Sequence, residues 1–143
     1  MNENELALLA NIYRNAEMGR DGLYFVLQRT GDTAFRRVVA TQLTEYQSIM
    51  DEAEDRLRVA GYSPTGNGPI AKMMVHMTAC HKTAQDNSPS ALADMLIQGS
   101  SMGVTKIARQ ISHSRAPGED VLALAERLQK TEENNIAHMK AYL

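Results

Sequence analysis

Three glutamates, Glu17, Glu45 and Glu132, are candidates for metal chemistry, because carboxylate oxygens are common ligands of divalent ions. Glu17 and Glu45 lie equally far, 14 residues, before and after Gly31. If a helical hairpin turns at Gly31, the two carboxylates lie at one level and face each other across the first helix pair. The spacing therefore predicts a layer of carboxylates halfway along that hairpin.

The third glutamate belongs to a second version of the same hairpin. Near the start of the chain, Met18-Gly19 is followed by Thr-Glu-Tyr-Gln-Ser-Ile over residues 44–49. Near the end, Met102-Gly103 is followed by Thr-Glu-Glu-Asn-Asn-Ile over residues 131–136. The repeat pairs Glu45 with Glu132 and predicts that both halves of the chain place a glutamate in the same layer.

This pattern resembles the ferritin-like superfamily, in particular small rubrerythrin-type bundles, and the resemblance covers both hairpins. In that family a Glu from each of two helices and a Glu-x-x-His from each of the other two hold two metal ions. The resemblance implies that Glu17, Glu45 and Glu132 match family glutamates. The positions that match the other three ligands hold Ser48, Asn135 and Ser101, or Gln98 if the third long helix is shifted by one turn.

Half of the six expected ligands are thus replaced by serine or an amide, which bind iron poorly. We therefore expect no working di-iron site and no cofactor, with iron or manganese bound only if the three glutamates still act as residual ligands. Buried carboxylates without a metal must be protonated, paired or hydrogen-bonded. Arg20 and Lys106 are the expected cationic partners, and Gln98 and Asn135 the neutral ones.

Gly19 and Gly103 lie in the middle of predicted helices, where glycine costs about 1 kcal/mol relative to alanine. Their repeated use at inward positions predicts that neighbouring backbones approach closely there. A narrow centre leaves less room for a pair of metal ions.

Residues 72–81 (Lys-Met-Met-Val-His-Met-Thr-Ala-Cys-His) hold a second group of potential ligands. Thioether, imidazole and thiolate groups suit Cu(I) or another soft ion. Four of them share one face of a helix: Met73, His76, Met77 and Cys80. Methionine and a single cysteine are also ordinary core residues, so the sequence favours an amphipathic helix that lies on the bundle, with a soft-metal site as the alternative.

Apolar residues that recur every three or four positions predict the helices that carry these residues. The expected ranges are 4–29, 33–60, 70–85, 89–113 and 118–142. We expect Gly31 to end the first helix in a left-handed conformation, Asp32 and Ser88 to cap helices, and Pro89 to start one. The predicted fold is all-α: one ferritin-like four-helix bundle domain over residues 1–143, made of two repeated antiparallel hairpins joined by a crossover that contains a short helix.

The composition of the chain argues against several classes of function. The formal net charge of the 143 residues is −2, so the chain offers no basic field for nucleic acid or a membrane surface. One cysteine, Cys80, excludes an intramolecular disulfide. An acidic N-terminus and the lack of a long apolar run predict no signal peptide and no membrane span. We expect a cytoplasmic protein.

The second helix is apolar over a wide arc, which predicts a homodimer or larger homo-oligomer. The arc consists of Val38, Val39, Leu43, Tyr46, Ile49 and Met50. The expected function is non-enzymatic: a structural, assembly or small-ligand-binding protein. The alternatives are a metal-binding protein or di-metal oxidoreductase that uses the residual carboxylates, and copper handling through the Met/His/Cys helix. Fold alone identifies neither substrate nor ligand.

Overall fold

Four long helices make up the computed structural model, which describes residues 1–64 and 86–143. They are α1 (Glu3–Leu27), α2 (Thr33–Val59), α4 (Pro89–His113) and α5 (Glu119–Lys140). Each bound lies within two residues of its prediction, and the described ranges contain no strand. The all-α prediction is confirmed for these residues. The predicted helix over 70–85 lies outside them.

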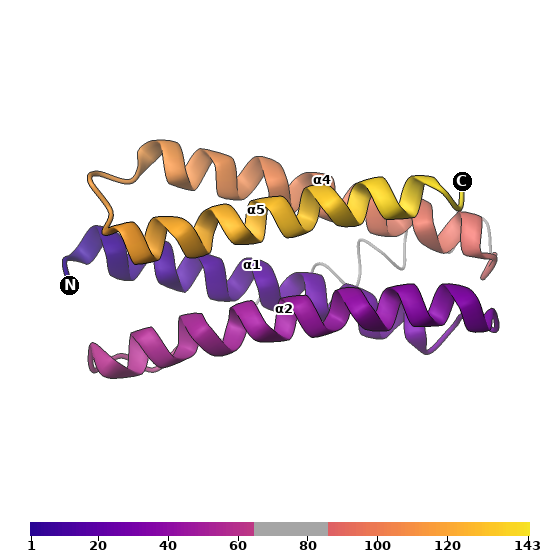
Figure 1. The fold of residues 1–143 in the computed structure, drawn as a ribbon, viewed down its shortest axis with the longest axis horizontal. Helices are drawn as coiled ribbons and strands as arrows, with labels where there is room; N and C mark the ends of the chain where they lie inside the picture. The colour runs from indigo at the N-terminus through magenta and orange to yellow at the C-terminus, as the bar shows by residue number, and fades with distance from the viewer. Residues whose placement is uncertain (65–85) are drawn as a thin grey trace.

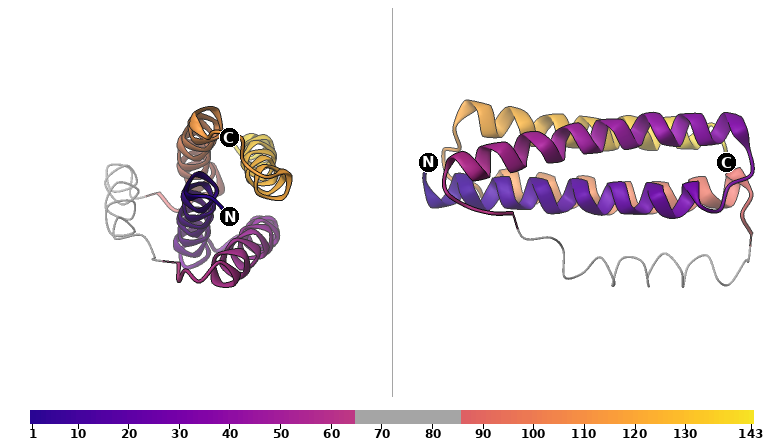
Figure 2. Two further views of the ribbon diagram at one scale, coloured as in Figure 1. Left: turned by 90° about the vertical axis from the view of Figure 1, so that its left-hand side faces the viewer. Right: turned by 90° about the horizontal axis from the view of Figure 1, so that it is seen from below.

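The helices form two antiparallel pairs, α1 with α2 and α4 with α5 (Figure 1). Figure 1 shows α1 and α5 running in one direction and α2 and α4 in the other. α1 packs against α2, α4 and α5, and α5 also packs against α2 and α4. Seen along the bundle in Figure 2, the four helices surround a common interior. α1 and α4 therefore form one side of the bundle, and α2 and α5 the opposite side.

Side chains at the helix starts bind backbone N–H groups that the first turn leaves without a partner. The Asp32 carboxylate accepts a hydrogen bond from the Phe35 N–H at 2.8 Å. The Ser88 hydroxyl accepts one from the Ala91 N–H at 3.2 Å, and Pro89 occupies the first turn of α4. The predicted caps of these two helices are confirmed.

The end of α1 differs from the prediction. Gly31 does not adopt a left-handed conformation. The guanidinium of Arg36 instead donates hydrogen bonds to the carbonyl groups of Leu27, at 2.7 Å, and Thr30, at 3.1 Å. Because a side chain from the next helix binds these carbonyl groups, the turn does not need a left-handed residue to satisfy them.

A left-handed glycine ends α2 instead. Gly61 has a φ of 85°, and its N–H donates to the Arg58 carbonyl at 2.9 Å. The Tyr62 N–H donates to the Leu57 carbonyl, also at 2.9 Å. This pair of bonds is the Schellman arrangement that commonly stops a helix.

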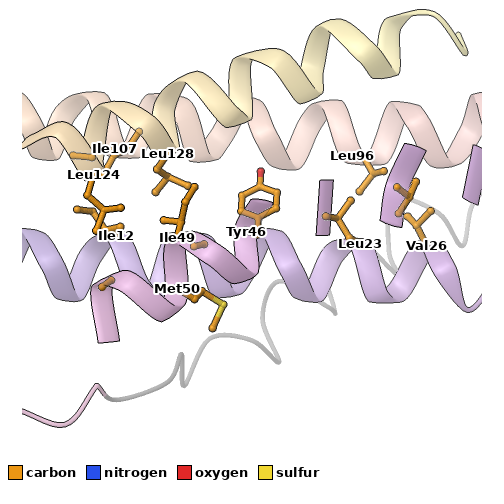
Figure 3. Packing of buried hydrophobic residues seen from close by; sticks show 14 of the residues in the cluster. Ile12, Leu23, Val26, Tyr46, Ile49, Met50, Leu96, Ile107, Leu124 and Leu128 are labelled. Carbon is orange, nitrogen blue, oxygen red and sulfur yellow. The ribbon is translucent and has the colours of Figure 1, made fainter. Parts of the chain in front are cut away.

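Apolar side chains from all four helices fill the interior, and Tyr46 stands among them. Figure 3 shows Tyr46 of α2 between two groups of these side chains. The labelled members of the groups are Ile12, Ile49, Ile107, Leu124 and Leu128 on one side, and Leu23, Val26 and Leu96 on the other. One polar residue of α2 therefore enters the core at mid-length.

The apolar arc of α2 packs largely within its own chain. Val39, Tyr46, Ile49 and Met50 are buried, and Val38 and Leu43 are half-buried against the core. Much of the apolar arc that led us to expect a homodimer is therefore covered by the same chain. The homodimer stays a prediction. None of the helices in residues 1–64 and 86–143 is both long and apolar enough to cross a membrane.

Candidate functional site

Glu132 is the most deeply buried carboxyl group among the described residues. It projects from α5 and is 2% exposed, and its Oε2 atom has no hydrogen-bond partner among the described residues. Burial raises the pKa of Glu132 from its ordinary value of 4.5 to about 9, although a hydrogen bond with Tyr46 lowers it. At neutral pH the folded protein therefore holds this group as a neutral carboxylic acid.

Tyr46 links Glu132 to the other helices. Its side chain is 2% exposed, and it forms side-chain hydrogen bonds with Ser100 of α4 and with Asn135 and Glu132 of α5. Burial and then the charge of Glu132 raise the pKa of the Tyr46 hydroxyl group. A buried tyrosine hydroxyl group needs a polar partner. The result is a small polar cluster in the interior of the bundle.

Gly19 and Gly103 make room for this cluster. A Cβ atom on Gly19 would overlap the ring of Tyr46, and a Cβ atom on Gly103 would overlap the carboxyl group of Glu132. The two glycines were expected to bring backbones together. In the structure each of them admits one large side chain, because only a residue without a Cβ leaves that space. The Asn15 amide donates to the Gly103 carbonyl at 3.1 Å and holds α1 against α4 here.

A cavity of about 570 Å³ lies between α1 and α4, with the polar cluster on its inner wall. Tyr46 and Glu132 line it from the far side of the bundle. Small residues leave its walls open: Gly19 and Gly22 of α1, and Gly99, Ser100, Ser101 and Gly103 of α4. Glu132, whose Oε2 atom lacks a hydrogen-bond partner among the described residues, thus lines a cavity large enough for a small molecule.

The two ends of the cavity differ in character. Leu23 of α1 and Met95 and Leu96 of α4 line one end. Lys106 and Arg109 of α4 line the other, and both are exposed. In the described part of the chain, neither cationic side chain forms an ion pair. The cavity is therefore apolar at one end and positively charged at the other.

On α2, the inward position that was expected for Glu45 is occupied by the next residue, Tyr46. Glu45 and Ser48 are exposed, and Arg127 of α5 contacts both. Its Nη2 atom lies 3.8 Å from Glu45 Oε2 and donates to the Ser48 hydroxyl at 2.8 Å. Tyr46 and Ile49 point inward instead. Burying an aromatic ring and an aliphatic side chain stabilises the helix in this orientation, whereas burying Glu45 would cost several kcal/mol.

Glu17 is also buried, at 5% exposed, but it does not line the cavity that Glu132 lines. Its charge helps to raise the pKa of Tyr13, after burial, which places Glu17 on the flank of α1 near that ring. No carboxyl group contributes to the raised pKa of Glu132. Arg20, an expected partner of Glu17, contacts Asp21 at 3.3 Å instead.

On α4, the inward position belongs to Ser100 rather than to the expected residues. Ser101 and Gln98 are exposed, and Gln98 donates to Asp94 at 3.2 Å. The remaining expected member of the layer, Asn135 of α5, is buried, at 5% exposed.

These residues do not fit a di-metal centre. Among residues 1–64 and 86–143, no three His, Cys, Asp or Glu side chains come together as possible ligands. The inward group is one neutral carboxylic acid beside a phenol. The soft-metal candidates Met73, His76, Met77 and Cys80 lie outside the described residues.

Comparison of the chain with protein-family models, with curated proteins and with solved structures gives no match. The ferritin-like assignment therefore stays a prediction.

Sequence reasoning missed Tyr46 and Ser100 as members of the site, and it treated Lys106 only as a cationic partner for buried carboxylates. Tyr46 lies on the apolar stripe of its helix, and its hydroxyl group is the signal that could have identified it. A tyrosine on a core-facing stripe must bury a polar atom and so requires a partner on a neighbouring helix.

Proposed function

We propose that this protein is a ferritin-like four-helix bundle that binds a small, largely apolar molecule and has no working di-metal centre. The observation that carries the proposal is the Glu132 carboxyl group, buried and incompletely hydrogen-bonded at the wall of the α1–α4 cavity. Leaving a buried polar atom without a partner costs about 1–3 kcal/mol. A ligand that binds in the cavity would supply the missing partner.

The wall of the cavity supports binding rather than a purely structural role. Ligand sites are concave and mostly apolar, with a few polar groups that orient the ligand. Gly22, Gly99 and the serines of α4 keep this wall open, although glycine in a helix costs about 1 kcal/mol relative to alanine. A bundle selected for stability alone would fill the space with larger side chains.

The ferritin-like part of the proposal rests on two repeated features. Consecutive helices form antiparallel pairs, α1 with α2 and α4 with α5. In each pair a mid-helix glycine lies against an inward residue, Gly19 with Tyr46 and Gly103 with Glu132. The proposed fold includes the repeated hairpins and the crossover with its short helix. We further propose a cytoplasmic homodimer that binds neither nucleic acid nor membranes.

Metal content tests the absence of a di-metal centre. Elemental analysis of protein purified without added metal should show no stoichiometric iron or manganese. A stoichiometric pair of either metal, lost in Glu132→Gln, would overturn this part of the proposal and favour the oxidoreductase alternative.

A neutral fluorescent probe, Nile red, tests ligand binding in the cavity. Ser101→Phe places a ring at the cavity, whereas Ser112→Phe makes the same change at an exposed position of α4 outside it. Wild type and Ser112→Phe should bind the probe saturably, and Ser101→Phe should bind it weakly. Failure of the wild type to bind, or equal binding by both variants, would refute the cavity as the ligand site.

A further inference from the structure

We propose that the ligand of the α1–α4 cavity is an amphipathic monocarboxylate, a molecule with one carboxylate head group and one apolar tail. The inference rests on the proposed function above and adds the chemical class of the ligand. Three features of the cavity carry it: its unpaired cations, the hydrogen-bond donor on its inner wall and its apolar far end.

The positive charge at one end is free to bind an anion. Ion pairs occupy Arg20, Arg56, Arg58 and Arg127, but in the described ranges no carboxylate contacts Lys106 or Arg109. Residues 65–85 contain no aspartate or glutamate. Two neighbouring cations without an acidic partner attract a negatively charged head group and repel an amine.

The inner wall near the same end offers a donor. A protonated carboxyl group has one O–H donor. Tyr46 is a hydrogen-bond partner of this carboxyl group. Oε2 of Glu132 has no partner among the described residues. A carboxylate oxygen of the ligand is an acceptor that suits this O–H, and the bond would be a charge-assisted one.

The geometry places the donor and the cations at one end. The Glu132 carboxyl group lies against Gly103, and Lys106 follows Gly103 on α4 by three residues, which is about 4.5 Å along the helix axis. A head group near Gly103 therefore has Glu132 on its inner side and the cations toward solvent. Extending back along α4 to Met95, the cavity offers about 12 Å for an apolar tail that ends near Leu23.

Three ligands with the same tail test the head group: decanoate, decanol and decylamine. Titration calorimetry of the wild-type protein should show that decanoate binds on the order of tenfold more tightly than decanol, with decylamine weakest. Equal or tighter binding of decanol or decylamine would overturn the inference.

A charge reversal tests the cationic end. Lys106→Glu should weaken decanoate binding on the order of tenfold. Lys130→Glu makes the same change in net charge on an exposed position of α5 that does not line the cavity, and it should bind decanoate as the wild type does. Equal effects of the two substitutions would contradict the assignment.

The two proposals fail in different ways. If Nile red binds but the three ligands are not distinguished, the cavity binds small molecules and the carboxylate inference is wrong. If neither Nile red nor decanoate binds, the proposed function itself is wrong.

Discussion

Replacing Glu132 by glutamine should change how the stability of the protein depends on pH. The folded-state pKa of Glu132, about 9, lies above the ordinary value of 4.5 that we assume for the unfolded chain. Between these values the folded protein keeps a proton that the unfolded chain releases, so the free energy of unfolding falls as pH rises. The contribution of Glu132 is fully present below about pH 4.5 and is lost as the pH rises through about 9.

The size of the effect follows from the same difference. Between these two pKa values, each rise of one pH unit lowers the free energy of unfolding by about 1.4 kcal/mol. From about pH 5 to about pH 8 the wild type should therefore lose about 4 kcal/mol relative to Glu132→Gln, which stays neutral. Glu132 is 2% exposed, so solvent hardly screens the effect, and Tyr46 is the titratable group hydrogen-bonded to it.

Urea unfolding of the wild type, Glu132→Gln and Glu133→Gln across this pH range measures the effect. Glu133 is exposed and adjacent, so its substitution removes the same charge at the surface. The Glu133→Gln curve should run parallel to the wild type, while the Glu132→Gln variant should become the more stable protein as pH rises. Three parallel curves would show that Glu132 is ionised in the folded protein at neutral pH and would refute the reasoning.

Four further substitutions test the packing by urea unfolding. Gly19→Ala should destabilise the protein by about 1–3 kcal/mol, because the Tyr46 ring cannot move away. Gly103→Ala should destabilise it less, since only the tip of the Glu132 side chain must shift. A larger loss of stability for Gly103→Ala than for Gly19→Ala would contradict this account. Asp32→Ala should cost about 1 kcal/mol through the lost cap of α2, and an unchanged midpoint would argue against it. Arg127→Ala should cost less than about 1 kcal/mol, because its ion pairs are solvent-exposed, and a larger loss would reveal a buried network.

The positions of the helices could be predicted closely from the sequence. Stripes of apolar residues and short polar breaks fix where helices run, and Asp32 and Ser88 mark two of their starts through a local hydrogen bond. The burial of Glu132 and Asn135 was also predictable, since both lie on the stripe of α5. These features depend on local sequence and on helical periodicity alone.

The identity of the inward residue was harder to predict. Glu45 and Tyr46 are adjacent, with Tyr46 on the apolar stripe and Glu45 beside it, so a small rotation of α2 decides which enters the core. That rotation depends on tertiary packing, here on the space that Gly19 leaves for the Tyr46 ring. The cavity was equally out of reach, because it depends on how closely α1 and α4 approach each other.

Chemical-shift mapping of isotope-labelled protein with decanoate tests most directly where the ligand binds. The backbone amides of the cavity glycines, Gly19, Gly22, Gly99 and Gly103, should shift in a saturable manner. Gly31 and Gly118 lie in turns outside the cavity and provide the internal control. Shifts confined to the four cavity glycines would support the account, whereas shifts at the turns alone, or no saturable shift, would contradict it.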